Sequence, residues 1–137
     1  MAISYLYHTF GEDFQKLDLP LLKEIETAKV SVLREMILKN VNSPLTSSLG
    51  RLFDGVAAIC GIRRRVNFEG QAAMEFEMLA AESTNQIYDY QWEAGKTYRL
   101  LPAPIIEGVV ADIQNRVPVA QIGAKFHGTL IRLFADF

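Results

Sequence analysis

The sequence has very little cysteine and histidine, and these absences narrow the chemistry it can perform. Cys60 is the only cysteine among 137 residues, so no disulfide can form within the chain. We interpret this lone thiol among apolar neighbours as a small core residue, which fits a reducing, cytoplasmic compartment. The two histidines, His8 and His127, are far apart, and neither has a second histidine or cysteine at metal-ligand spacing. We therefore predict no metal site in this chain and interpret His127 as a structural or surface residue.

Basic charge, long apolar runs and nucleotide motifs are also missing. The formal net charge of -2 argues against nonspecific nucleic-acid binding and gives no support to binding at an anionic membrane surface. No apolar run approaches the length of a membrane span, and the first ten residues lack the pattern of a secretion signal. Neither a P-loop nor a dinucleotide fingerprint occurs. The sequence therefore identifies no catalytic residue.

The sequence does contain apolar residues at helical spacing. Half of the residues are hydrophobic and 22% are charged, which is ordinary for a globular domain. The periodicity predicts helices over residues 2–10, 20–39, 49–60, 69–81, 105–117 and 119–137. Aromatic and β-branched residues at 87–92 and 97–101 flank a glycine-bearing turn and predict a β-hairpin. The predicted fold class is therefore mainly α with one small β-hairpin.

Local signals define the ends of these helices. Asn40 tolerates a left-handed cap at the end of one helix, Ser47 or Ser48 can cap the next, and Gly61 ends it. Residues 62–68 form a connector with some strand character. On the helix that follows, the residues expected to face inward are Ala72, Phe76, Leu79 and Ala80.

The helix over residues 49–60 has two different sides. Its apolar stripe consists of Leu49, Leu52, Phe53, Val56 and Cys60. Its opposite side holds Ser47, Gly50, Arg51, Asp54, Gly55 and Ala58. A glycine inside a helix costs about 0.5–1 kcal/mol relative to alanine, and a close approach of another group to this backbone would account for that cost. Either a ligand approaches the glycines and Asp54 accepts hydrogen bonds from its hydroxyls, or another helix packs there and Arg51 and Asp54 form a local ion pair. The residues alone favour packing.

The start of the next helix, Glu69-Gly70, also has two interpretations. Helix N-terminal amides can hold an anion or a polar ligand, and Glu69 is also favourable at the positive end of any helix dipole.

The end of the chain is equally ambiguous. Leu130, Leu133, Phe134 and Phe137 keep helical spacing up to the last residue. Such an end is typical of a helix that docks on a core or of a fragment of a longer chain, and we favour the fragment.

Three stretches together resemble the carboxy-terminal region of the HypF family, the carbamoyltransferases that help to mature nickel–iron hydrogenases. They are PLTSSLGRLFDGVAAICG at residues 44–61, VNFEGQAAMEFEMLA at residues 66–80 and AKFHGTLIRLF at residues 124–134. Their shared features are the Ser-Ser pair, the Gly-Arg-Leu-Phe-Asp run, the Phe-Glu-Gly-Gln-Ala-Ala helix start and the Phe-His helix. The flanking segments are compatible with the same family, so the resemblance covers essentially the whole chain.

The resemblance implies an activity and a site. Domains of this kind are similar to the threonylcarbamoyl-transferring enzymes of transfer-RNA modification and belong to the actin-like ATPase (ASKHA-type) superfamily. In the full protein, carbamoyl phosphate and ATP yield carbamoyl-adenylate. The carbamoyl group then passes to the C-terminal cysteine of the partner protein HypE and is dehydrated to the cyanide ligand of the active-site iron. Carried over by motif, the nucleotide-binding residues are Asp54, Gly70, Glu69, Gln71, Glu75 and Gly50, with Asp54 and Gly70 at the ribose.

The departures from the family pattern matter equally. The histidine-rich metal motif, the Ser-Gly-Gly phosphate-binding stretch, the final metal-ligand aspartate and the acylphosphatase and zinc-finger domains have no counterpart here. We therefore expect residues 1–137 to be one fragment, the helical lobe of a two-lobed domain, and to be inactive alone. Zinc and the divalent metal are expected to bind elsewhere in the full-length protein. The alternative is a noncatalytic helical interaction module, and self-association of the isolated chain fits both hypotheses because each exposes an apolar face.

Overall fold

The computed structural model describes residues 1–62, 67–68, 70–80 and 84–136, and its chain divides into two compact units. The first unit is Met1–Ala73 and the second is Met74–Phe137. Each unit is described by itself. No helix in the described ranges is both long and apolar enough to cross a membrane.

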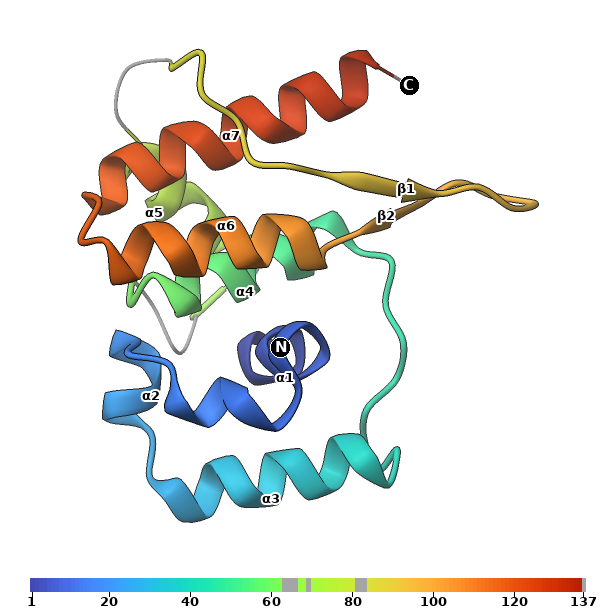
Figure 1. The fold of residues 1–137 in the computed structure, drawn as a ribbon, viewed down its shortest axis with the longest axis vertical. Helices are drawn as coiled ribbons and strands as arrows, with labels where there is room; N and C mark the ends of the chain where they lie inside the picture. Colours follow the sequence, from blue (N-terminus) through green and yellow to red (C-terminus); the bar gives the residue numbers. More distant parts are fainter. Residues whose placement is uncertain (63–66, 69, 81–83, 137) are drawn as a thin grey trace. The chain divides into compact units, whose positions relative to one another are not determined.

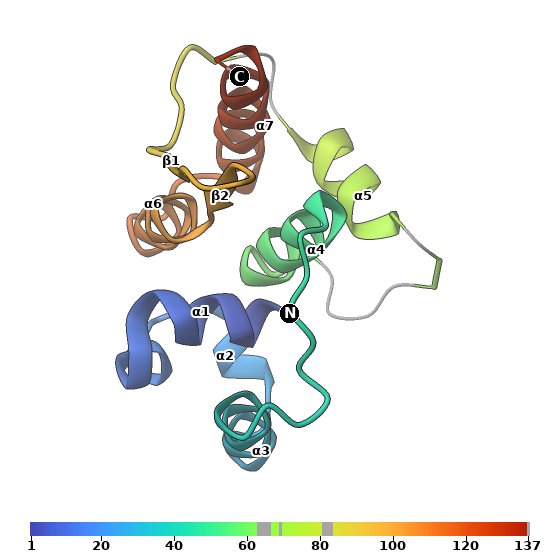
Figure 2. The same cartoon turned by 90° about the vertical axis from the view of Figure 1, so that its right-hand side faces the viewer.

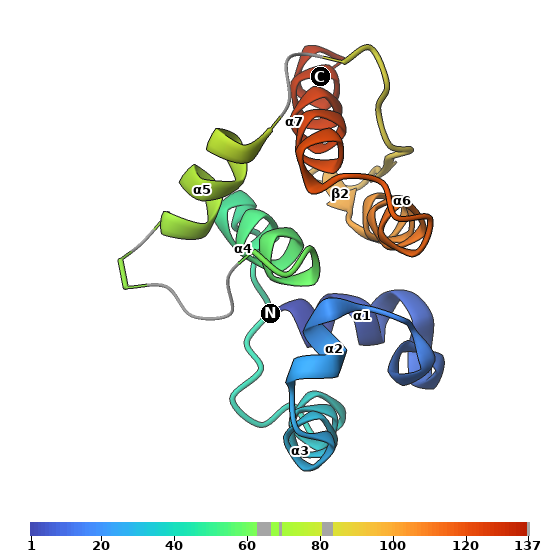
Figure 3. The same ribbon diagram turned by 90° about the vertical axis from the view of Figure 1, so that its left-hand side faces the viewer.

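The first unit is a layered arrangement of helices. Its elements are α1 (Ala2–Phe10), the 3-10 helix η1 (Gly11–Lys16), α2 (Pro20–Glu24), α3 (Thr27–Leu38) and α4 (Leu49–Ile59). Helices α1 and α2 lie between α3 and α4 (Figure 2), and Figure 3 shows the same layering from the opposite side. The side chains of Leu6, Phe14 and Val56 are fully buried in this unit. Helix α1 is thus the central element against which α4 packs.

One predicted helix of this unit is wrong in its length. The expected helix over residues 20–39 is divided into α2 and α3, because Ile25 and Glu26 adopt extended backbone with ψ of 132° at both residues. Apolar spacing continues across this break, so periodicity gave no sign of it. The predicted end is confirmed, since Asn40 has a left-handed φ of 53°.

The second unit packs helices beside a short hairpin. Helix α5 (Gln71–Leu79) begins in the last residues of the first unit and continues into the second. Helices α6 (Ala103–Gln114) and α7 (Val119–Ala135) lie side by side (Figure 1). Strands β1 (Gln91–Glu93) and β2 (Arg99–Leu101) pair antiparallel, with Trp92 opposite Leu100. The hairpin is confirmed, although its strands are shorter than the sequence predicted.

The expected inward faces are confirmed in part. Ala72 and Phe76 are buried, but Leu79 is 51% exposed, so its predicted inward orientation is wrong. On α7, Leu130 and Leu133 are buried, whereas Phe134 is 60% exposed. The strand character expected for residues 62–68 falls largely on 63–66, and Phe137 likewise lies outside the described residues.

Cys60 is buried at the end of α4, which confirms its interpretation as a core residue. Burial raises the pKa of its thiol to about 12. At pH 8 we therefore expect it to react about 10³-fold more slowly with an aromatic disulfide reagent than a free cysteine, because so little thiolate is present. Adding denaturant should abolish this protection. A native reaction as fast as that of free cysteine would contradict the buried position.

Candidate functional site

The N-terminus of α4 is built by a serine cap. Ser48 precedes the helix, and its hydroxyl oxygen accepts a hydrogen bond from the backbone amide of Arg51 at 3.4 Å, which confirms one of the two predicted caps. The first amides of the helix, those of Leu49 and Gly50, have no intrahelical partner in this geometry. Gly50 is exposed, and a Cβ added there would meet nothing among the described residues closer than the Ser48 hydroxyl at 3.6 Å. Packing within the described structure therefore gives no reason for a glycine at this position.

Gly55 has a different explanation. It is buried, and an added Cβ would lie 2.6 and 2.7 Å from two ring carbons of Tyr5 on α1. Real Cβ atoms do not approach other atoms so closely, so only glycine lets the ring sit here. The interpretation that the residues favoured, packing of another helix against these glycines, is thus confirmed at Gly55. Close packing of α1 on α4 accounts for it.

Asp54 lies one helical turn after Gly50, so the two share one face of α4. Its side chain is 27% exposed, and one carboxylate oxygen lies 3.7 Å from a guanidinium nitrogen of Arg51. The predicted local ion pair is therefore confirmed. Burial raises the pKa of Tyr5, and the negative charge of Asp54 raises it further. The Asp54 carboxylate is thus within electrostatic reach of both Arg51 and Tyr5.

The start of α5 uses glycine for its conformation. Gly70 has a φ of 80°, a left-handed value that other residues adopt only with strain, and no atom of the described residues lies within 4 Å of an added Cβ. The next residue, Gln71, is buried, and its side-chain oxygen accepts a hydrogen bond from the Asn67 backbone amide at 2.7 Å. Glu75 is half-buried one turn further along, and Glu69 lies outside the described residues. The predicted site residues therefore form two groups, one on α4 and one at the start of α5.

A polar cluster in the second unit was not predicted. Asp112 on α6 accepts hydrogen bonds from the Tyr88 hydroxyl at 2.8 Å and from the Lys125 ammonium at 2.7 Å. That ammonium also lies 4.4 Å from the centre of the Tyr88 ring. The hydroxyl of Thr129 accepts from the Tyr88 backbone amide at 2.8 Å and donates to the Lys125 carbonyl at 2.6 Å. We assign this cluster a structural role, because it ties the segment before β1 to α6 and α7.

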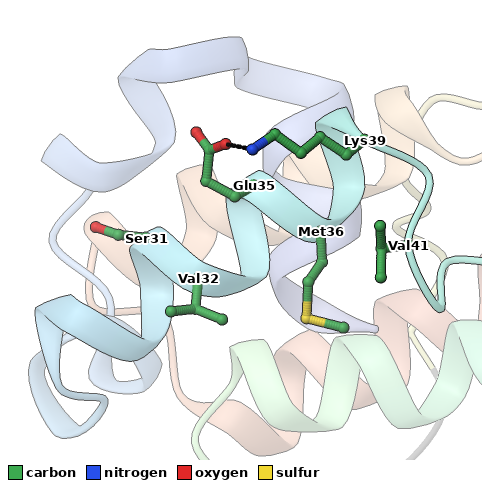
Figure 4. A pocket seen from close by; sticks show the side chains of 6 residues that line it. All are labelled: Ser31, Val32, Glu35, Met36, Lys39 and Val41. Atoms are coloured by element: carbon green, nitrogen blue, oxygen red, sulfur yellow. Dashed lines mark ion pairs between the residues drawn. The ribbon is translucent and has the colours of Figure 1, made fainter.

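Two surface hollows were also not predicted. The first, of ≈ 300 Å³, lies along one side of α3 and is almost wholly apolar, with an ion pair between Glu35 and Lys39 at its edge (Figure 4). Its lining residues are Ser31, Val32, Glu35, Met36, Lys39 and Val41. The second, of ≈ 380 Å³, lies beside Tyr88, Gly108 and Lys125 in the second unit. Neither hollow is lined by any of the predicted nucleotide-binding residues.

His127 lies on α7, where its ring contacts the backbone of the same helix. The Nδ1 atom of His127 lies 2.7 Å from the carbonyl oxygen of Gly123 in the same helix, which fits the structural interpretation. Within residues 1–62, 67–68, 70–80 and 84–136, no three His, Cys, Asp or Glu side chains gather closely enough to hold a metal ion.

Comparisons with known proteins identify a family to which the sequence of this chain is similar. The family described as "Carbamoyltransferase, Kae1-like Domain, second subdomain" matches residues 1–137. Carbamoyltransferase HypF of Synechocystis sp. is 28% identical over 148 residues, which cover 97% of this chain and 19% of that protein. The HypF of Rhizobium leguminosarum bv. viciae is 40% identical over 109 residues, which cover 79% of this chain and 14% of that protein.

The fold itself is also found in a solved structure. A crystal structure of full-length HypF in the phosphate- and nucleotide-bound form matches with a TM-score of 0.87 and 31% identity, covering 98% of this chain and 17% of that one. The chain thus spans less than a fifth of the length of these relatives. The chain belongs to the HypF carbamoyltransferase family, in which it corresponds to the second subdomain of the Kae1-like domain.

Proposed function

We propose that this chain is the helical lobe of an actin-like ATPase domain and contributes one part of a nucleotide site. In the complete enzyme, carbamoyl phosphate and ATP form carbamoyl-adenylate, and the carbamoyl group passes to the C-terminal cysteine of HypE for cyanide-ligand synthesis. The divalent metal and zinc bind elsewhere in the full-length protein, so this lobe is inactive alone. The proposal is supported by membership of the HypF family and by the similarity to a HypF structure that holds nucleotide.

The observation that carries the site proposal is the face of α4 that joins Gly50 and Asp54. Gly50 is open, and no packing within the described residues requires it. One turn later the side chain of Asp54 is half-buried, and 27% of its surface stays accessible. A carboxylate accepts hydrogen bonds from the two vicinal hydroxyls of a ribose, and a residue without a side chain lets the sugar approach the helix backbone. In this proposal Asp54 binds the ribose and Gly50 leaves room for it.

The residues at the start of α5 have more limited roles in this proposal. Gly70 is explained by its positive φ, and among the described residues no atom lies within 4 Å of a Cβ added there. The Gln71 side chain binds the Asn67 amide, so we propose that it holds the turn before α5 in shape. Glu75 and Glu69 remain proposed neighbours of the nucleotide.

A substitution in the complete enzyme tests the role of Asp54. We expect Asp54→Asn to weaken ATP binding about 10- to 100-fold, because a hydrogen bond to a charged group contributes about 1.5–3 kcal/mol. Isothermal titration calorimetry would measure the Kd. The matched control is Asp13→Asn, which removes an exposed carboxylate from the same unit and should leave the Kd unchanged. Equal affinity of the Asp54 variant and the wild type would contradict the proposal.

The alternative, a noncatalytic helical interaction module, is favoured by one observation. The hollow along α3 is apolar, and Val32 beside it is 59% exposed, as expected of a surface that contacts another protein. This alternative predicts that Asp54→Asn changes no nucleotide affinity, so the same titration separates the two functions.

A further inference from the structure

A close contact between α1 and α4 lies beside the proposed ribose-binding residue. Two ring carbons of Tyr5 lie within 2.7 Å of the position that a Cβ of Gly55 would occupy, and Gly55 directly follows Asp54 in the chain. The ring therefore rests on the backbone of α4 itself. Any other residue at position 55, or a ring in another place, would change the separation of the two helices at this turn.

The ion pair with Arg51 restrains Asp54 only weakly. The Arg51 guanidinium is 60% exposed and lies 3.7 Å from the carboxylate, and exposed ion pairs of this kind contribute about 0–1 kcal/mol. By contrast, α1 is anchored to the core by Ile3 and Leu6, which are 5% and 0% exposed. Tyr5 projects from this fixed helix. Its ring thus restrains the Asp54–Gly55 turn directly, in addition to the buried side chains of Leu52 and Val56 on α4 itself.

We propose that Tyr5 is a positioning residue for the nucleotide site. Its aromatic ring sets the distance between α1 and the Asp54–Gly55 turn of α4, and so holds the Asp54 carboxylate where it can bind the ribose. This inference rests on the proposed role of Asp54 in nucleotide binding. The contribution comes from the ring, which fills the space above Gly55. Small displacements of a binding group cost substantial affinity, so loss of the ring should act on nucleotide binding.

Steady-state kinetics of the complete enzyme test this inference with four variants. Tyr5→Leu removes the ring and should raise the KM for ATP about 5- to 10-fold while kcat stays within about twofold, because uniform binding is lost. Tyr5→Phe retains the ring and should restore the wild-type KM. Tyr7→Leu removes an equal ring from the same helix, one whose ring contacts are with His8 and Phe14, and should leave KM unchanged. Asp54→Asn should raise KM by itself.

The outcomes separate this inference from the proposal on which it rests. A merely structural role would reduce the folded fraction of Tyr5→Leu, so kcat would fall at unchanged KM, and this result would overturn the inference. If Asp54→Asn raises KM and Tyr5→Leu does not, the inference is also wrong, but the proposed function stands. If Asp54→Asn leaves KM unchanged, the proposed function fails and the inference falls with it.

A double-mutant cycle adds a test of the contact itself. Gly55→Ala inserts a methyl group into the space of the Tyr5 ring and should also raise KM. Combined with Tyr5→Leu, the same methyl group meets a smaller side chain, so the double variant should have a lower KM than the product of the two single effects predicts. Independent, multiplicative effects would show that the Tyr5–Gly55 contact does not position the site.

Discussion

Replacing Phe76 with alanine is expected to lower the free energy of unfolding of the second unit by about 3–5 kcal/mol. The Phe76 side chain is fully buried, and its ring centre lies 5.6 Å from that of Phe126 and 5.7 Å from that of His127. It is the residue through which α5 packs on α7. The packing is close, since a Cβ added at Gly123 would meet the Phe76 ring at 3.3 Å.

Urea denaturation can measure this change in the isolated chain. Trp92 is the only tryptophan and belongs to the second unit, so its fluorescence reports the unfolding of that unit. The control is Met78→Ala on the same helix, where the side chain is 83% exposed and the expected change is within about 0.5 kcal/mol. Equal midpoints for the two variants would contradict the packing of α5 on α7.

The second large effect is expected at Asp112. Its carboxylate is 17% exposed and accepts hydrogen bonds from both Tyr88 and Lys125, whose own side chain is 18% exposed. Asp112→Ala leaves a mostly buried ammonium and a phenolic hydroxyl without their acceptor. We expect a loss of about 2–3 kcal/mol in the free energy of unfolding, below the 3–5 kcal/mol of fully buried pairs because water still reaches both groups.

A graded set of variants checks this value by the same fluorescence titration. Asp112→Asn keeps an oxygen acceptor for Tyr88 but loses the charge, so its loss of stability should lie between those of the wild type and Asp112→Ala. Glu107→Ala removes an exposed carboxylate from the same helix and should change stability by less than about 0.5 kcal/mol. If the cluster contributed nothing to stability, all three variants would have the same free energy of unfolding, and this result would contradict its structural role.

Much of the helical framework could be predicted from apolar spacing and caps. The bounds of α1, the Ser48 cap of α4 and the presence of a hairpin agree with the sequence signals, although the strands are shorter than predicted. The break between α2 and α3 could not be predicted, because no glycine or proline marks Ile25 and Glu26 and the apolar period continues through them. Periodicity reports which face of a segment is apolar, and a change of direction leaves that pattern intact.

The two glycines of α4 show where the prediction of the site could and could not succeed. The sequence left open whether Gly50 and Gly55 admit a ligand or a neighbouring helix. The structure gives each glycine a different answer, since Tyr5 occupies the space at Gly55 while Gly50 remains open. Nothing in the local sequence distinguishes them, because the partner of Gly55 lies 50 residues away in the chain. The role of Asp54 came from the family motif and stays a prediction.

The polar cluster around Asp112 was missed for the same reason. Its hydrogen-bonded residues are separated by 13, 24 and 41 positions, and no spacing rule connects a tyrosine, an aspartate, a lysine and a threonine at such intervals. One signal was available: Gly108 lies within α6, where a glycine costs stability, and the Tyr88 ring occupies the place of its Cβ. A glycine within a helix can therefore indicate an aromatic ring, from a distant part of the chain, that packs against the helix backbone.

The measurement that tests the central claim most directly is an amide NMR titration of this chain with AMP, carried out in parallel with Asp54→Asn. If the lobe contains a preformed half of the nucleoside site, chemical-shift changes should cluster from Gly50 to Asp54 and at Gly70, and those on α4 should disappear in the variant. No change at millimolar AMP would contradict a preformed half-site. Changes that lie along α3, or changes on α4 that persist without the Asp54 carboxylate, would contradict the assignment of Asp54 as the ribose-binding residue.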